Sequence, residues 1–417
     1  MRLLIAVLAA VVLAPLAAAQ TPQLTGRIDV DPRVGLLSGD LCVRGTSGAS
    51  TFLLNRGLNI RGVRNAATSQ ALSFDGFYNA QNRGDATPYA VEGDAHEGFC
   101  VSYVGAFPVY RVDDGERAAN DWKGQIAFDG RTVRAAEQTR FYPVPIDAET
   151  GDELDQLAYD IEINCARCRS IYWSGAAPVR GSRARFASDT PRMLLLYAGD
   201  FPFTSVEGAH FVGASVSPAA ANTIRTGLRA IEAAHEAYLG AEMIDEPSML
   251  SFAALGGENR ALGNNTWGFA TWPTIASDGR MSFDAMAEGG PPGRLAPGRE
   301  RYLAHEMAHH FFGARYTPRG PLRWFLLEST AEFLASRAVR TMQGEEAYMA
   351  LLRDYARQSP AEVVPLNQPA SLGGARERDQ RRCRASDFGR TRAIAATRGC
   401  YLCFVPRARA ASRRERG

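Results

Sequence analysis

The pattern His-Glu-x-x-His at residues 305–309 constrains the fold of this 417-residue chain more than any other feature. On a helix, residues four positions apart lie on the same face, so His305 and His309 direct two imidazoles toward one point. Glu306 stands beside that point, where a general base for a zinc-activated water belongs. Three of the six histidines fall within 305–310 and their neighbours are apolar, which predicts a buried helix. Buried imidazoles and carboxylates need partners, and a metal ion supplies one.

A second predicted helix supplies a third ligand. Residues 322–342 combine helix formers with apolar positions at helical spacing, and the Pro- and Gly-containing segment 314–321 predicts the turn before them. Helices joined by a short loop tend to pack antiparallel, which places Glu328 opposite the histidine pair. Glu332, one turn further, is a candidate to accept the N–H of a ligating imidazole. A solvated helix charge is the competing interpretation. The apolar neighbours of Glu328 argue against it, and for Glu332 it stays open.

Together, His305-Glu306-x-x-His309, eighteen intervening residues and Glu328 resemble the gluzincin metallopeptidases. The spacing is that of the aminopeptidase-N family, which includes the leukotriene hydrolases, and the Trp324-x-x-x-Glu328 context resembles that family too. The Glu328 and Glu332 pair is similar to the thermolysin arrangement. The resemblance implies that His305, His309 and Glu328 bind one Zn²⁺ per chain. It also implies that Glu306 activates the water that hydrolyses a peptide substrate.

Two further family features have only partial counterparts. In the family, a Gly-x-Met-Glu-Asn segment before the zinc helix binds the free amino end of the substrate. Gly256-Gly-Glu258-Asn259 is reminiscent of it but lacks the methionine, and a surface loop is the alternative. A family tyrosine well beyond the third ligand stabilises the oxyanion of the tetrahedral intermediate, and here only Tyr401 lies at a comparable distance. The resemblance therefore implies peptidase chemistry without fixing endo- or aminopeptidase action.

The N-terminus predicts the compartment. Residues 1–19 begin Met-Arg, continue as an uncharged and mostly apolar stretch, and end in small residues, as in a secretory signal peptide cleaved after Ala19. A membrane anchor is the alternative, although the stretch is short for one. No other segment is long and apolar enough to span a membrane, so no stable span is expected after cleavage. The sequence predicts an exported protein, periplasmic or secreted.

The net charge and the choice of basic residues indicate a bacterial chain with no general attraction to nucleic acid. The formal net charge is +2, which gives no general attraction to nucleic acid. Lys123 is the single lysine, and all the other basic side chains are arginine. Such usage is typical of a GC-rich genome.

The hydrophobic pattern predicts an α+β chain with two folded domains. Across residues 20–215, short apolar runs alternate with turn residues, as in an antiparallel β-sandwich. Residues 155–163 fit a strand or a helix equally well. From 216 the period changes: residues 217–240 predict a helix with a Ser-Pro start and a Gly stop, and His235 on it is expected at an ordinary helix interface. By the resemblance, residues 216–360 form a thermolysin-like, mainly helical zinc peptidase domain.

The C-terminal segment 361–417 is an Arg-rich, atypical tail. Residues 375–417 carry thirteen arginines against four acids, and helical periodicity fades after Pro360. A tail that does not continue the parent fold, for example through a frameshift in the gene, is the simpler hypothesis. A basic nucleic-acid-binding tail is the other. The helical lobe that closes the family's cleft is then curtailed, which predicts a weak or inactive enzyme as one outcome.

Seven cysteines fit an exported chain with structural disulfides. Cys42 and Cys100 lie in strand-like stretches and are candidates for one bridge. Cys165 and Cys168 form a C-x-x-C pair, for which a structural disulfide is expected in an exported protein. Cys383, Cys400 and Cys403 lie in the tail.

Two functions remain open at this stage. The first is an exported zinc metallopeptidase that hydrolyses peptide bonds with water activated by zinc and Glu306. The second is a non-catalytic binding or structural protein, derived from a peptidase, in which zinc holds two helices together. A closed ligand set without an exchangeable water distinguishes the second from the first.

Overall fold

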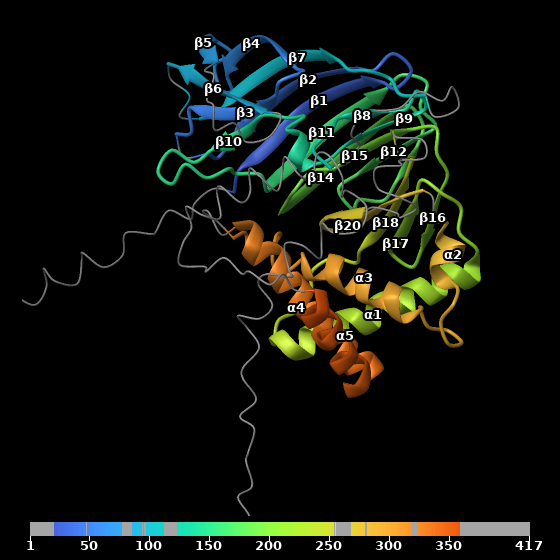
Figure 1. The fold of residues 1–417 in the computed structure, drawn as a ribbon. Coiled ribbons are helices and arrows are strands. Elements are labelled where there is room, and N and C mark those ends of the chain that lie inside the picture. The colour runs from blue at the N-terminus through green and yellow to red at the C-terminus, as the bar shows by residue number, and fades with distance from the viewer. Residues whose placement is uncertain are drawn as a thin grey trace, which may run out of the picture.

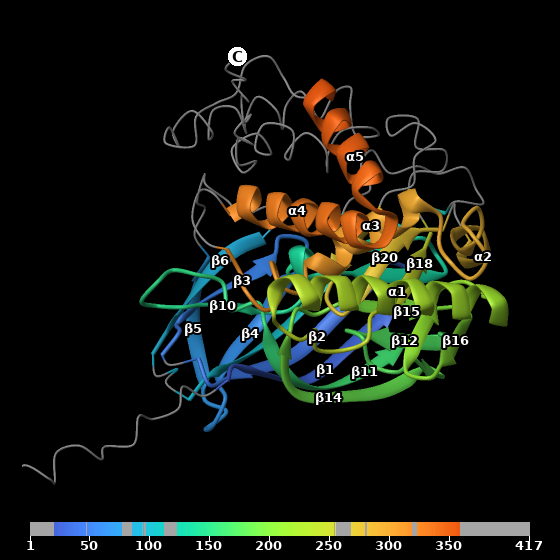
Figure 2. The ribbon, with the colours of Figure 1, turned by 90° about the horizontal axis from the view of Figure 1, so that it is seen from below.

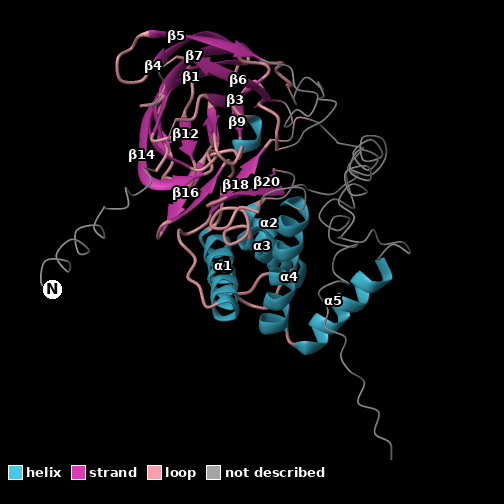
Figure 3. Ribbon diagram, turned by 90° about the vertical axis from the view of Figure 1, so that its left-hand side faces the viewer, coloured by secondary structure: helices cyan, strands magenta, loops and turns pink. Residues whose placement is uncertain are grey.

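The computed structural model describes residues 21–358 except 47, 77–85, 94, 96, 112–122, 254, 256–267, 280–281 and 319–322. The predicted signal peptide, the Glu258 segment and the tail with Tyr401 and its three cysteines lie outside the described residues. The strands lie at one end of the molecule and the helices lie at the opposite end (Figures 1 and 3).

Ten strands form a curled sheet in the order β10-β3-β6-β5-β4-β7-β2-β1-β11-β14. Its neighbours pair antiparallel except β1 and β11, which run parallel, so the predicted antiparallel domain contains one parallel pair. The strands are β1 (Gln23–Asp31), β2 (Leu36–Arg44), β3 (Thr51–Asn55), β4 (Asn59–Asn65), β5 (Ala71–Gly76), β6 (Ala86–Glu92), β7 (Phe99–Ala106), β10 (Val144–Ile146), β11 (Leu157–Cys165) and β14 (Arg183–Arg192).

Strand β11 settles the segment that the sequence left open between strand and helix. Leu157, Tyr159, Ile161 and Ile163 are all buried, and the residues that alternate with them include the more accessible Asp160 and Glu162. This period of two is that of a strand with one face on the core. The segment lies between β1 and β14 and pairs with both through its backbone, while its apolar face packs on the core.

A second, five-stranded sheet encloses the core with the first. It has the order β13-β12-β15-β9-β8. Trp173 lies in the core between the sheets, with its ring centroid 5.9 Å from those of both Phe141 and Tyr159 in edge-on contacts. The strands are β8 (Ala127–Phe128), β9 (Thr132–Ala135), β12 (Ser170–Trp173), β13 (Val179–Arg180) and β15 (Leu196–Gly199).

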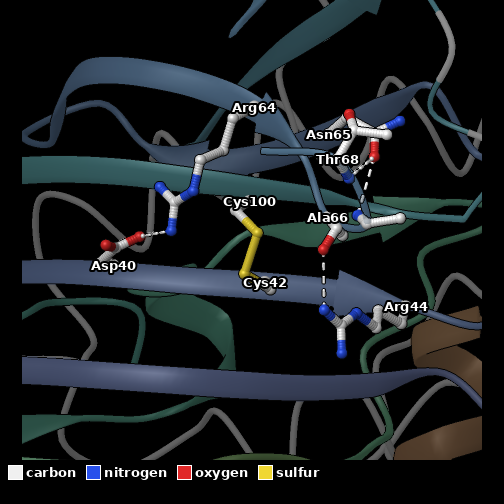
Figure 4. The surroundings of a disulfide bond; sticks show 9 residues. Asp40, Cys42, Arg44, Arg64, Asn65, Ala66, Thr68 and Cys100 are labelled. Carbon is white, nitrogen blue, oxygen red and sulfur yellow. Dashed lines mark hydrogen bonds and ion pairs between the residues drawn. A yellow bond between two sulfur atoms is a disulfide. The ribbon is translucent and has the colours of Figure 1, made fainter. Parts of the chain in front are cut away.

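Two disulfides cross-link the strand-rich part, and they join the cysteine pairs that the sequence offered as candidates. Cys42 on β2 and Cys100 on β7 are directly paired in the sheet and joined through their sulfurs (Figure 4). Beside them, Arg64 bonds Asp40 at 2.7 Å across the strands (Figure 4). Cys165 and Cys168 form the second bridge, which closes the turn after β11.

A third sheet lies against the helices, in the order β16-β17-β18-β20-β19. Strands β17, β18 and β20 are parallel, and β16 and β19 flank them antiparallel. Every residue of β18 and β20 is buried, so these two short strands carry no period of two in sequence. The strands are β16 (Phe203–Val206), β17 (Ala209–Val212), β18 (Ser248–Phe252), β19 (Gly268–Thr271) and β20 (Thr274–Asp278).

Five helices follow or interrupt this sheet. The helices lie beneath the sheets in Figure 1, where α1 and α4 contact each other, and Figure 2 shows α5 further out. The predicted ends of α1 are confirmed: Ser217 caps the first turn by accepting a hydrogen bond from the Ala220 N–H, and Gly240 ends the helix in the left-handed conformation at φ 64°. The helices are α1 (Pro218–Leu239), α2 (Phe283–Ala287), α3 (Pro297–Ala308), α4 (Arg323–Gln343) and α5 (Glu345–Gln358).

Buried hydrogen bonds join the strand-rich and helical parts. The Tyr172 and Thr274 hydroxyls lie 2.6 Å apart, and Gln156 Nε2 donates to Thr317 Oγ1 at 3.1 Å. Among the described residues, no helix combines the length and apolar character that crossing a lipid bilayer requires.

Candidate metal centre

Helices α3 and α4 bring three potential metal ligands to one point. His305 and His309 lie one turn apart at the C-terminal end of α3, and Glu328 faces them from α4. Glu328 Oε2 lies 3.4 Å from His305 Nε2 and 3.9 Å from His309 Nε2. One donor atom from each of the three residues lies within 4.8 Å of the others. The predicted juxtaposition of the two helices therefore exists in the fold.

Both imidazoles present the Nε2 atom to this point because their Nδ1 atoms have other partners. His305 Nδ1 lies 2.9 Å from Glu332 Oε2, and His309 Nδ1 lies 3.2 Å from the carbonyl oxygen of Phe312. Since these partners are acceptors, each Nδ1 carries a proton and donates it, which leaves Nε2 as the ring atom that each histidine can offer to a metal. The structure thus decides the open question about Glu332: it is buried beside a histidine ring and is not a solvated charge.

The pKa values of the three candidate ligand side chains differ strongly from their usual values. Burial raises the pKa of Glu328, but the two histidines outweigh it and the net pKa falls to about 2. Burial lowers the pKa of His309 to about 4, so this imidazole is neutral. For His305 burial acts in the same direction, but hydrogen bonds to Glu328 and Glu332 dominate and raise its pKa well above the usual value. Glu328 and His309 thus have the anionic and neutral forms that bind metal, whereas His305 has to release the proton on Nε2 to act as a ligand.

Glu306 is buried on the same helix and does not belong to the three-ligand group. The pKa of its carboxyl is raised to about 7: burial is the largest cause and Glu328 adds to it, while His305 and Lys123 act in the opposite direction. A carboxyl group with a pKa near neutrality both accepts and returns a proton at neutral pH.

The residues present fit a zinc ion. Two imidazole nitrogens and one carboxylate oxygen form a donor set of catalytic zinc sites, which keep one position open for water or substrate. Three carboxyl groups converge here, those of buried Glu306 and Glu332 and of partly buried Glu328, and a divalent cation offsets the mutual repulsion of such charges.

The sequence did not single out several residues that surround the centre. Lys123 Nζ lies 2.5 Å from Glu137 Oε1 and donates to the Ala270 carbonyl, and its charge acts on Glu306, His309 and Glu328. The sequence signal that could have identified Lys123 is that it is the only lysine in an arginine-rich chain. Arg301, one turn before His305 on α3, was recognisable only by that spacing. Tyr355 lies on α5 and contacts Glu332, and no sequence pattern predicts this contact.

Comparison with known proteins gives a match in structure only. No family model matches the chain, and no curated protein does. Among solved structures, the chain is similar to yeast leukotriene A4 hydrolase, with a TM-score of 0.56 and 11% identity over 81% of this chain and 51% of that one. It is also similar to the M1 zinc metallopeptidase from Deinococcus radiodurans, with a TM-score of 0.52 and 14% identity over 83% and 76%. A mutant of that enzyme bound to a Tyr-Ser-Ala substrate gives a TM-score of 0.54 and 15% identity over 91% and 80%.

These likenesses show the fold. The chain has the architecture of zinc metallopeptidases of this kind: a strand-rich N-terminal part with a curled sheet, then a helical part with the His-His-Glu group. It spans about half the length of the yeast enzyme. The fold that the resemblance implied is thus confirmed at this level.

Proposed function

We propose that this chain is a zinc metallopeptidase that hydrolyses peptide bonds. The observation that carries the proposal is the convergence of His305, His309 and Glu328 from two adjacent helices, with donor atoms within 4.8 Å of one another. Buried Glu306 on the same helix supports it. In this proposal His305, His309 and Glu328 hold one Zn²⁺ per chain. A bound zinc ion acts as a Lewis acid toward a carbonyl and lowers the pKa of water.

Glu306 is the proton carrier in this mechanism. Its carboxylate accepts a proton from the attacking water and delivers it to the leaving amine, so it returns to its starting state. Glu332 and the Phe312 carbonyl hold the two imidazoles in one tautomer and one orientation throughout. Burial excludes bulk water from Glu306, which strengthens every charge interaction that it makes.

Several finer features belong to the same proposal. Residues 20–215 form a β-rich N-terminal domain, residues 216–360 a thermolysin-like catalytic domain, and residues 361–417 an Arg-rich, atypical tail. Residues 1–19 direct export and are removed. The packing of α1, α3 and α4 on β18 and β20 supports the catalytic domain, and β16 and β17, from residues 203–212, extend the same sheet.

The zinc content of the purified chain tests the proposal. After dialysis against a weak chelator, about one zinc per chain is expected, and the metal should be lost in His305→Ala. His210→Ala is the matched control, because this half-exposed histidine lies on β17 and bonds Ser205. A folded wild-type chain without zinc contradicts the proposal. Zinc that is held without any hydrolysis in a peptide library points to the non-catalytic alternative.

A further inference from the structure

The Glu332 carboxylate on α4 is held by residues of both neighbouring helices. Its Oε2 atom accepts a hydrogen bond from His305 Nδ1 at 2.9 Å. Its Oε1 atom accepts two from Arg301, from Nη2 at 2.8 Å and from Nε at 3.1 Å. The Tyr355 hydroxyl on α5 donates to the same Oε1 atom. The two oxygens thus have separate partners, so the plane of the carboxylate is fixed.

Little of this cluster is open to solvent. Glu332 and Tyr355 are each 4% exposed, so water does not replace the phenol as a donor to Oε1. The Arg301 guanidinium lies 5.2 Å from the centre of the Tyr355 ring, so the two donors also support each other. Neither residue belongs to the group of potential metal ligands.

We propose that Arg301 and Tyr355 are positioning residues of the metal centre. By fixing Oε1 of Glu332 they aim Oε2 at His305 Nδ1, and this fixes the direction of the Nε2 lone pair. The inference rests on the proposed function, because it concerns how well the His305, His309 and Glu328 group holds zinc. It extends the centre from α3 and α4 to α5.

Zinc affinity is the property that should respond. An imidazole whose outer partner is loosened loses both orientation and basicity, and removing such partners typically weakens metal binding by about 10–100-fold. Tyr355→Phe removes one donor to Oε1 and leaves the ring in place, so a loss near the lower end, about 10-fold, is expected. Glu332→Gln removes the negative charge of the acceptor itself and should weaken zinc binding more than Tyr355→Phe does.

The matched control is Tyr348→Phe. Tyr348 also lies on α5 and also contacts arginine side chains, those of Arg337 and Arg340, but it does not bond Glu332. Zinc dissociation constants are measured by competition with a chromophoric chelator. Urea unfolding of the metal-free forms is measured in parallel. A merely structural role for Tyr355 lowers metal-free stability and leaves the zinc affinity of the folded protein unchanged.

Arg301→Gln carries the test if Tyr355→Phe does not fold, because the Arg301 side chain is 30% exposed and tolerates replacement. Weakened zinc binding in Arg301→Gln or Tyr355→Phe, with Tyr348→Phe at the wild-type value, supports the inference. Wild-type affinity in both Arg301→Gln and Tyr355→Phe, with weakened binding in Glu332→Gln, overturns it while the zinc site stands. Failure of the wild-type chain to bind zinc instead removes the proposed function.

Discussion

Lys123 Nζ and Glu137 Oε1 lie 2.5 Å apart, in a buried ion pair that joins the strand-rich part to the edge strand of the third sheet. Lys123 also donates to the carbonyl of Ala270 on β19, and Thr271 on the same strand donates to Glu137 Oε2 at 2.7 Å. The pair therefore fixes β19 beside the metal centre, and neither charge has bulk water to replace its partner.

Lys123→Met should be strongly destabilising. Removing one member of a buried pair leaves the other charge uncompensated, which costs about 3–5 kcal/mol in the free energy of unfolding. Urea denaturation measures this. The double variant Lys123→Met with Glu137→Gln should recover most of the loss, because it removes both charges. A double variant no more stable than Lys123→Met shows that the lysine contributes by packing alone.

Glu306→Gln should separate binding from turnover. The amide keeps the size of the side chain but does not accept a proton, so peptide hydrolysis should fall by at least about 100-fold. Zinc content should stay near one per chain, because Glu306 is not one of the three ligands. Elemental analysis and a peptide-cleavage assay on the same sample check both parts. Full activity in this variant contradicts the assigned role.

His235 should make stability depend on pH below neutrality. Burial lowers the pKa of its imidazole from 6.5 to about 4, although Nε2 lies 2.9 Å from the Ala304 carbonyl. The unfolded chain takes up a proton near pH 6.5 and the folded chain does not. The stabilisation is therefore complete above about pH 6.5 and declines as the pH falls to about 4, by roughly 3 kcal/mol.

His235→Gln provides the comparison for that decline. Glutamine keeps an N–H donor for the Ala304 carbonyl and does not titrate, so its unfolding free energy should fall less between pH 7 and pH 4. The other titrating groups are common to both proteins, and the difference between the two curves isolates His235. Parallel curves mean that His235 does not cause the pH dependence.

The Cys42–Cys100 bridge should contribute substantially to stability. It closes a sequence separation of 58 residues, for which restriction of the unfolded chain gives about 4 kcal/mol. Cys42→Ser with Cys100→Ser should lower the free energy of unfolding by about that amount in denaturant titrations. Cys165→Ser with Cys168→Ser is the control, because that bridge closes a separation of only 3 residues and should matter less.

The metal centre was predictable because its information is local. The spacing of His305 and His309 already places both on one face of a helix. The helical periodicity around Glu328 predicts the second helix, which carries the third candidate ligand. The caps of α1 were predictable for the same reason, since Ser217 and Gly240 act within one turn.

The remaining features depend on contacts between distant parts of the chain. The parallel pairing of Gln23 with Ala158 brings together segments that no local pattern connects. Likewise, the positions of Lys123 and Tyr355 follow from how the third sheet and α5 pack, and not from their own neighbours in sequence. A strand buried on both faces, such as β20, loses the alternation by which strands are recognised.

The position of Lys123 has a practical consequence. Since it is the only lysine of the chain and its side chain is 15% exposed, an amine-selective label has a single side-chain target, and that target is shielded while β19 stays docked. The rate at which Lys123 becomes acylated thus reports the opening of the junction between the strand-rich and helical parts. Lys123 therefore serves as a single built-in chemical probe of the contact between the strand-rich and helical parts.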